Sequence, residues 1–206
     1  QSDIHLKSNG NIFIKATDPA GNSARADFPY YIKRRTFKND ILNISDRFLK
    51  VKMQEFDIDI PPNTQSPLSA KFLKVNREVR ADSYKKIREL TLKTKNVLHW
   101  NGVFLRLPRS ATRAGFADHR KYNYNNIIID NQVHLGIDLA SLFQSPIPAA
   151  NSGEVVFSDN IGIYGKTVLI DHGFGLFSMY SHLSHINVKI GQILSKGDII
   201  GRTGTT

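Results

Sequence analysis

The chain has 206 residues, of which 40% are hydrophobic and none is cysteine, and it carries a formal net charge of +10 at pH 7. The absence of cysteine excludes disulfides, thiolate metal sites and a cysteine nucleophile, and the lack of any run of 18 apolar residues excludes a membrane-spanning helix. The positive charge favours an anionic partner such as nucleic acid, anionic lipid or a cell-wall polymer. Much of this charge lies between residues 71 and 95, which contain nine Lys or Arg and three acidic residues. This cluster is either a solvated helix face or an anion-binding surface.

Residues 1–36 are predicted to form an N-terminal β segment. Residues 11–32, NIFIKATDPAGNSARADFPYYI, have the pattern of two short strands joined at DPAGN, whose Pro, Gly and Asn favour a turn. A lone hairpin is only marginally stable. We therefore expect this hairpin to pack on the rest of the chain or to be the end of a larger β domain.

Residues 37–96 form a basic segment with helical periodicity. Apolar residues recur at helical intervals after Ser45, a predicted N-cap, and DIDIPPNTQ then ends this helix with two prolines. Ser66 and Pro67 predict the cap and first position of a second helix that runs to about Lys93. Its buried stripe is expected to comprise Phe72, Val75, Val79, Ile87 and Leu90, and Tyr84 would extend it.

From Leu98 onward the pattern changes to short alternating runs separated by Gly, Pro and Asn. The candidate strands lie at 103–107, 125–140, 153–159, 165–173, 175–183 and within 188–204. Many short strands between turn signals predict an antiparallel β domain. The fold class is therefore α+β and mainly β: an antiparallel β-sheet domain at 97–206, preceded by the helical segment at 37–96 and by the hairpin or partial β domain at 1–36.

Within this domain, VHLGIDLASL (133–142) places a histidine and a carboxylate four residues apart. The apolar residues Val133, Leu135, Ile137 and Leu139 alternate with the polar or small ones and are expected to face the core. Zinc binds imidazole nitrogen and carboxylate oxygen, but positions i and i+4 of an extended strand lie about 13 Å apart. One ion would therefore require a bend, which Gly136 permits. By itself the motif fits a short polar strand face equally well.

A second polar pattern occurs in GLFSMYSHLSHI (175–186), whose alternation places Tyr180 and His182 on one strand face. A histidine that titrates near neutrality can accept a proton from water or stabilise developing charge, although a surface histidine would give the same pattern. His185 falls where the strand should turn and is expected to face solvent. His119, with Arg113, Arg120, Tyr122 and Tyr124 nearby, is predicted to lie in a polar surface loop, with a position lining or covering a groove as the alternative.

Taken together, the order HLGIDLA, PIPAANSGEVVFS and IYGKTVLIDHGFGLFSMYSHLSHINVKIGQILSKGDIIGRTGTT resembles the lysostaphin-type (LytM-domain) zinc endopeptidases of bacterial cell walls. In that family an HxxxD motif is followed by a strand pair with a DHG turn, by YxHLS and by VxxGQxxxKGxxIGxxGxT. The resemblance covers about residues 130–206. It implies that His134 and Asp138 are ligands of Zn2+ and that His182 assists water attack or steadies the oxyanion. It also implies structural roles for Asp171 and His172 in the DHG turn.

The resemblance further implies hydrolysis of peptide bonds in peptidoglycan, in the bacterial periplasm or cell envelope, with any signal or anchor outside these residues. Peptidoglycan peptides and an anionic wall surface are the expected partners. Nucleic acid is not expected, because neither an aromatic platform nor a recognition helix is evident.

The family completes its site with an HxH pair shortly after GxxGxT, and no such pair follows within these 206 residues. We therefore expect residues 1–206 alone to carry two of three protein ligands and to be inactive; His119 and His182 are the first candidates for another third ligand. The alternative is a non-catalytic LytM-type module that binds the wall or activates another wall hydrolase.

Overall fold

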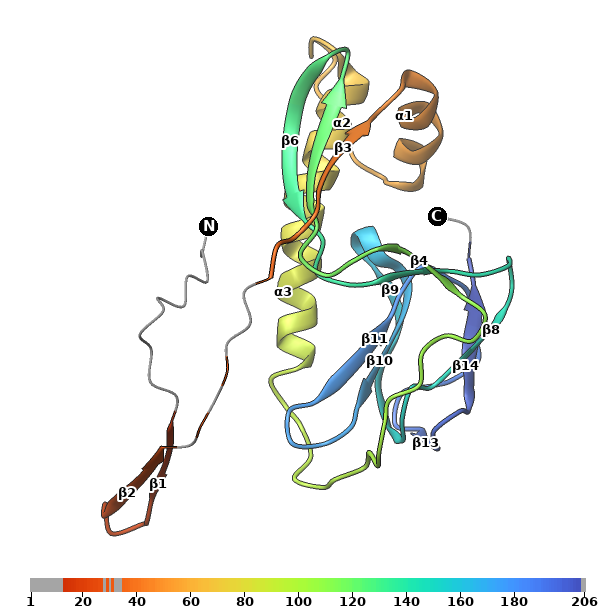
Figure 1. Cartoon of the computed structure of the whole chain (residues 1–206). Coiled ribbons are helices and arrows are strands. Elements are labelled where there is room, and N and C mark those ends of the chain that lie inside the picture. The colour runs from red at the N-terminus through yellow and green to blue at the C-terminus, as the bar shows by residue number, and fades with distance from the viewer. Residues whose placement is uncertain (1–12, 28, 30, 32–34, 205–206) are drawn as a thin grey trace. The chain divides into compact units, whose positions relative to one another are not determined.

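The computed structural model describes residues 13–27, 29, 31 and 35–204, and the chain divides into two compact units, residues 1–36 and residues 37–206 (Figure 1). In the first unit, β1 (Phe13–Thr17) and β2 (Ser23–Asp27) form an antiparallel pair. The carboxylate of Asp18 closes the turn by accepting a hydrogen bond from the backbone N–H of Asn22 at 2.8 Å. The hairpin expected here is confirmed; the outer ends of its sequence pattern, residues 11–12, 28, 30 and 32, lie outside the described residues.

The second unit begins with β3 (Asn39–Asn43), α1 (Asp46–Lys52) and the short 3-10 helix η1 (Met53–Glu55). The start of α1 agrees with the sequence, because the hydroxyl of Ser45 accepts a hydrogen bond from the backbone N–H of Phe48 at 3.2 Å. Leu49 and Met53 are buried, whereas Phe48 is 45% exposed. Strand β3 was not predicted, because its five residues, NDILN, show no clear alternation of apolar and polar residues.

A long helix follows in three pieces: α2 (Pro67–Lys74), the π-helical segment η2 (Val75–Val79) and α3 (Arg80–Leu90). Pro67 occupies the first turn as predicted. The prediction for Ser66 was wrong, since its φ of 58° is left-handed and its side chain makes no capping hydrogen bond. The helix also ends at Leu90, short of Lys93. The amide of Asn76, buried in η2, donates a 2.7 Å hydrogen bond to Asp130 and so ties the helix to the sheet.

The rest of the unit is built from short strands. They are β4 (Ala111–Ala114), β5 (His119–Tyr124), β6 (Ile127–Val133), β7 (Asp138–Ala140), β8 (Pro146–Pro148), β9 (Gly153–Ile161), β10 (Gly165–Asp171), β11 (Phe177–Tyr180), β12 (Leu183–Ile186), β13 (Ile193–Leu194) and β14 (Ile199–Thr203), with the 3-10 helix η3 (Gly162–Tyr164) between β9 and β10. The strand orders are β11-β10-β9-β13, β12-β14-β8, β3-β5-β6 and β4-β7. The mainly antiparallel β fold is confirmed; the pair β3 and β5 is parallel.

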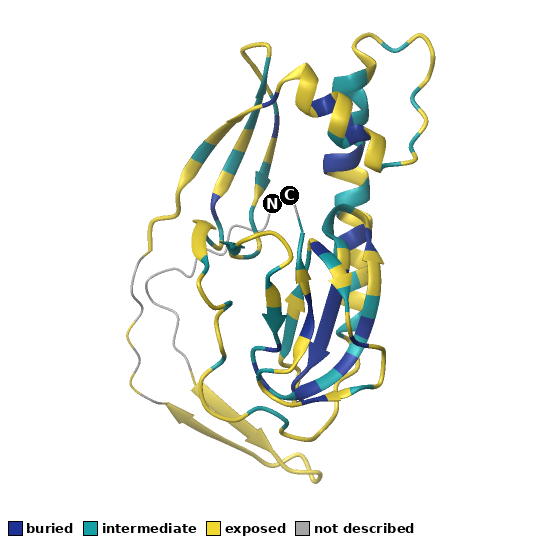
Figure 2. Ribbon diagram, turned by 90° about the vertical axis from the view of Figure 1, so that its right-hand side faces the viewer, coloured by how far each residue is buried: buried dark blue, intermediate teal, exposed yellow. Residues whose placement is uncertain are grey.

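Two apolar clusters lie on the two faces of the four-stranded sheet. Between the four-stranded sheet and β12-β14-β8 lies a core that includes Val155, Val168, Ile170 and Ile200. On the other face of the four-stranded sheet, α3 packs over a second cluster, whose buried members are Phe157, Ile161 and Leu169. Figure 2 shows buried positions gathered along these strands and on the long helix, whereas the β1–β2 hairpin is exposed throughout.

Three further secondary-structure predictions were wrong. Residues 103–107 form no strand. The run 125–140 is broken into β6 and β7 by a bend, and Val133, Leu135 and Ile137, which were expected to face the core, are exposed. Residues 119–124, expected in a loop, form β5, because they pair with β3 on one side and β6 on the other.

No helix in the described part of the chain combines the length and the apolarity that crossing a membrane requires.

Candidate active site

The bend between β6 and β7 brings His134 and Asp138 together. Nε2 of His134 lies 3.0 Å from Oδ1 of Asp138. The bend is centred on Gly136, as the sequence predicted. The two side chains expected to act together therefore meet at this bend.

The ring of His134 is held in one orientation by its other nitrogen. Nδ1 lies 2.9 Å from the backbone oxygen of Gly115. A carbonyl oxygen only accepts, so Nδ1 carries the hydrogen, and Nε2 of the neutral ring then presents a lone pair. That lone pair faces a carboxylate oxygen. Two hydrogen-bond acceptors 3.0 Å apart repel each other unless a proton or a cation lies between them. An imidazole nitrogen and a carboxylate oxygen are ligands that zinc binds.

The segment that leads into β5 supports both side chains. The buried carboxylate of Asp118 accepts a hydrogen bond from the backbone N–H of Gly115 at 2.7 Å, and so holds the carbonyl that orients His134. Nη2 of Arg120 donates to Oδ2 of Asp138 at 2.9 Å. Sequence reasoning missed these roles of Gly115, Asp118 and Arg120, since they appear only when β5 is placed beside β6.

His182 stands just beyond β11 with a left-handed φ of 58°. Its backbone N–H donates to the oxygen of Tyr164 at 2.9 Å, and its own carbonyl accepts from the N–H of Gly204 at 3.1 Å. The prediction that Tyr180 and His182 share a strand face was wrong, because the strand ends at Tyr180. The Tyr180 hydroxyl accepts a hydrogen bond from the backbone N–H of Ala150 and packs against the core.

Desolvation of the ring by neighbouring atoms is the main reason why the pKa of His182 is lowered, although the residue as a whole is exposed to solvent. The charges of Asp138 and Glu55 raise this pKa, whereas those of Lys52 and His134 lower it. Lys52 and Glu55 form an ion pair of 3.0 Å at the end of α1. The electrostatic environment of His182 is thus shared by the β6–β7 bend and by α1.

The DHG turn is saturated with hydrogen bonds. His172 is fully buried, with Nδ1 2.7 Å from the oxygen of Ser152 and Nε2 2.7 Å from Oγ of Ser178. The Asp171 carboxylate accepts from the N–H of Gly173 and the hydroxyl of Thr94. These hydrogen bonds engage the polar atoms of both side chains, which fits the structural roles that the resemblance implies for Asp171 and His172.

Two further histidines, His119 and His185, lie on exposed strand positions. His119 is exposed on β5, and His185 is exposed on β12, where it faces solvent as expected but lies within a strand rather than at a turn. Within the described residues there is no group of three or more His, Asp or Glu that could hold a metal ion. Neither His119 nor His182 therefore joins His134 and Asp138 as a third ligand in this structure.

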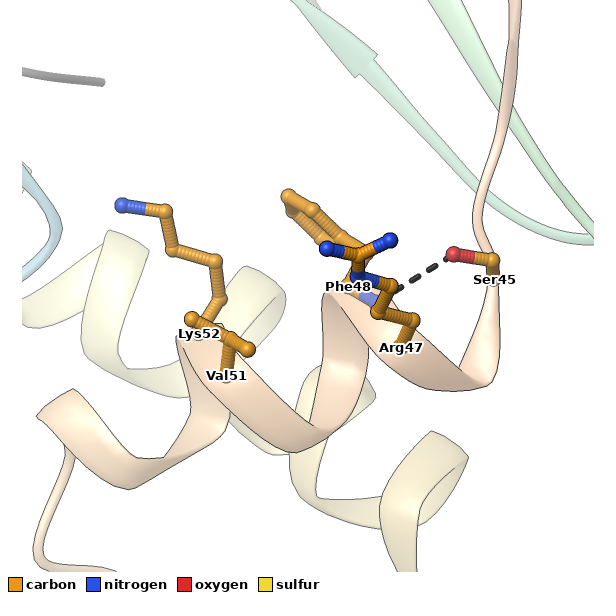
Figure 3. Close-up of a pocket in the computed structure, with 5 residues that line it drawn as sticks. All are labelled: Ser45, Arg47, Phe48, Val51 and Lys52. Atoms are coloured by element: carbon orange, nitrogen blue, oxygen red, sulfur yellow. Dashed lines mark hydrogen bonds between the residues drawn. The ribbon is translucent and has the colours of Figure 1, made fainter.

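A shallow depression of about 410 Å³ lies on α1 (Figure 3). It is lined by Ser45, Arg47, Phe48, Val51 and Lys52. This surface carries apolar and cationic side chains without a metal-binding group. The chemistry of the chain is thus concentrated at the β6–β7 bend and not in this depression.

Comparison with known proteins covers the part of the chain that holds these residues. Residues 132–206 match the family model described as Peptidase family M23, and this part of the chain is similar to peptidases of the lysostaphin type. The matched region contains His134, Asp138 and His182.

Three curated relatives are similar over this region. The DD-carboxypeptidase/endopeptidase Mpg of Neisseria meningitidis is 33% identical over 41% of this chain and 20% of its own length. The peptidoglycan DD-endopeptidase ShyA of Vibrio cholerae is 40% identical over 35% of this chain and 17% of its own. Lysostaphin of Staphylococcus staphylolyticus is 31% identical over 48% of this chain and 23% of its own. The chain thus spans about a fifth of the length of the curated relatives that it matches.

Proposed function

We propose that this chain is the core of a zinc-dependent endopeptidase that hydrolyses peptide bonds in peptidoglycan, with residues 97–206 as its peptidase domain. The observation that carries the proposal is the approach of His134 Nε2 to Asp138 Oδ1, with the imidazole oriented through its other nitrogen. One relative, named as a peptidoglycan DD-endopeptidase, supports the substrate class. A bacterial cell-envelope location follows from that substrate.

His134 and Asp138 would hold the zinc ion through Nε2 and Oδ1. Zinc bound in such a site polarises the scissile carbonyl and lowers the pKa of its water to about 7. The chain's own contribution is to keep these donors ready: the Gly115 carbonyl fixes the tautomer of His134, and Arg120 occupies the second oxygen of Asp138.

His182 is assigned proton handling beside the reacting carbonyl. Its lowered pKa keeps the imidazole neutral at pH 7, so that the ring can accept a proton from the attacking water and return it to the leaving amine. Two backbone hydrogen bonds, from its N–H to Tyr164 and from Gly204 to its carbonyl, hold its main chain in place. In this role His182 needs no contact with the metal.

A catalytic zinc site usually takes three protein ligands and keeps one position for water. The described residues bring two ligands together. We therefore expect a polypeptide of residues 1–206 to bind zinc weakly and to cleave no cross-linked muropeptide. Zinc-dependent cleavage by this polypeptide would contradict the two-ligand site.

The proposal is tested by adding a third ligand. A variant with a His-x-His segment appended beyond Thr206 is incubated with zinc and cross-linked muropeptides, and products are identified by mass spectrometry. We expect cleavage of peptide bonds, abolished by His134→Ala and kept by His185→Ala, a matched change of an exposed histidine on β12. If the extended variant binds purified sacculi and stimulates another wall hydrolase without cleaving any peptide, the non-catalytic module is the correct reading.

A further inference from the structure

Arg120 is a side chain at this site that the sequence motif does not contain. It lies on β5, the central strand of the sheet β3-β5-β6, where it is paired with Gln132 of β6 and with Asp40 of β3. This placement anchors its backbone on both sides. Its side chain is only 21% exposed, and Nη2 reaches Oδ2 of Asp138 at 2.9 Å.

Asp138 has much less support of its own. It opens β7, a strand of three residues, and its side chain is 47% exposed. A carboxylate in such a position can rotate about its χ angles unless a partner holds it. In this structure one partner faces each oxygen: Arg120 holds Oδ2, and Oδ1 is left pointing at Nε2 of His134.

From this division of the two oxygens we infer that Arg120 is the positioning residue of the metal ligand Asp138. The guanidinium keeps the carboxylate rotated so that Oδ1 alone is presented to a metal together with His134. The inference rests on the proposed function, because it assumes that His134 and Asp138 bind metal. Together with the Gly115 carbonyl that orients His134, it gives each of the two ligands its own outer partner, and both partners come from residues 115–120.

A different role for the contact between Arg120 and Asp138 predicts the opposite change in zinc affinity when Arg120 is removed. If Arg120 served only as a positive charge that fills the place of an absent cation, its removal would relieve repulsion and strengthen metal binding. If Arg120 positions Asp138, its removal frees the carboxylate and weakens metal binding, and the loss of such an outer partner typically costs about 10- to 100-fold in affinity. Zinc affinity therefore separates the two roles.

The test measures zinc affinity of the 206-residue chain by competition with a chromophoric chelator. Arg120→Ala is expected to weaken zinc binding about 10- to 100-fold. Arg120→Lys keeps the charge and a donor of similar reach but loses the planar fork, so it should restore part of the loss. Arg77→Ala is the matched control, because Arg77 makes a comparable ion pair of 3.1 Å with Asp130 of β6, away from the site. It should lower the free energy of unfolding and leave zinc affinity unchanged.

The outcomes are distinct. Zinc affinity in Arg120→Ala that equals or exceeds the wild-type value overturns the positioning role while the proposed function stands, provided that His134→Ala still abolishes binding. An equal loss in Arg120→Ala and Arg77→Ala shows a general effect on folding and also overturns it. A wild-type chain that binds no zinc overturns the proposed function and this assignment together.

Discussion

Among single residues, His172 and His182 both have a lowered pKa, but their neutral rings serve different roles. Desolvation of the ring is the largest cause of the lowered pKa in both. His172 is fully buried, with both ring nitrogens engaged, so its neutral form is part of the packed structure. His182 keeps contact with solvent, so its neutral form is available to a substrate.

The lowered pKa of His172 predicts a contribution of this residue to the pH dependence of stability. Its folded-state pKa lies below the ordinary value of 6.5, so the unfolded chain binds the proton more readily. The resulting stability is complete above that value and is lost as pH falls through the folded-state pKa. Urea unfolding should therefore give a lower free energy of unfolding at about pH 5.5 than in neutral buffer.

The variant His172→Asn removes this titration. It should be less stable than the wild type in neutral buffer, because a buried hydrogen-bonded ring is lost, but its stability should change less between the two pH values. His185→Asn, at an exposed position, serves as the control and should keep the wild-type dependence. An unchanged pH dependence in His172→Asn would show that the neutral ring of His172 contributes nothing to it.

At the scale of elements, the end of β14 supports the main chain of His182. A Cβ placed on Gly204 would lie 2.5 Å from the carbonyl oxygen of His182, too close for any side chain. Glycine at this position lets the two backbones approach and form their hydrogen bond of 3.1 Å. Gly204, directly after β14, thus helps to hold the candidate catalytic histidine in place.

Gly204→Ala is accordingly expected to move His182 and to lower the free energy of unfolding by about 1–3 kcal/mol. Gly191→Ala is the control for backbone strain: its φ of 81° makes a side chain unfavourable there too, but no described atom lies within 4 Å of the added Cβ, so His182 is not displaced by contact. The imidazole resonances of His182, followed by NMR, should shift in Gly204→Ala and stay in place in Gly191→Ala. If the His182 resonances are the same in the two variants, the contact with Gly204 does not hold His182 in place.

Elements with local signals were predictable, and those with distant partners were not. The beginning of α1 follows from Ser45 and the residues next to it, whose hydrogen bond lies within one turn. Strand β3 pairs only with β5, far along the chain, so its own five residues give little indication of it.

In the candidate site, too, the local contacts were predictable and the contacts between distant segments were not. The meeting of His134 with Asp138 depends on a bend at Gly136, within five residues, and the sequence predicted it. The contact of Arg120 with Asp138 needs the β5–β6 pairing to be known first. The alternation around His182 was misleading, because its left-handed backbone breaks the strand pattern.

At the scale of the whole molecule, the charge of +10 is concentrated on the long helix and the residues after it. Exposed cations of α3 include Lys85, Lys86 and Arg88. Charges on a solvated surface act over about a Debye length, which is about 10 Å at 0.1 M salt. Attraction to an anionic wall through this surface would therefore weaken steeply with salt.

We expect retention on purified sacculi, measured by co-sedimentation, to fall as salt rises from about 0.05 to about 0.5 M. Changing Lys85, Lys86 and Arg88 together to Gln should lower retention at low salt, whereas Lys15→Gln on the β1–β2 hairpin should lower it less. Strong retention at high salt would contradict a charge-driven role for this helix.

The most direct test of the central claim is a zinc titration of the wild-type chain beside His134→Ala, followed by calorimetry, with His185→Ala as the control. We expect one zinc ion to bind per wild-type chain and per His185→Ala chain, and binding to be lost in His134→Ala. Equal zinc binding by the wild type and His134→Ala would contradict the assignment of the β6–β7 bend as the metal site.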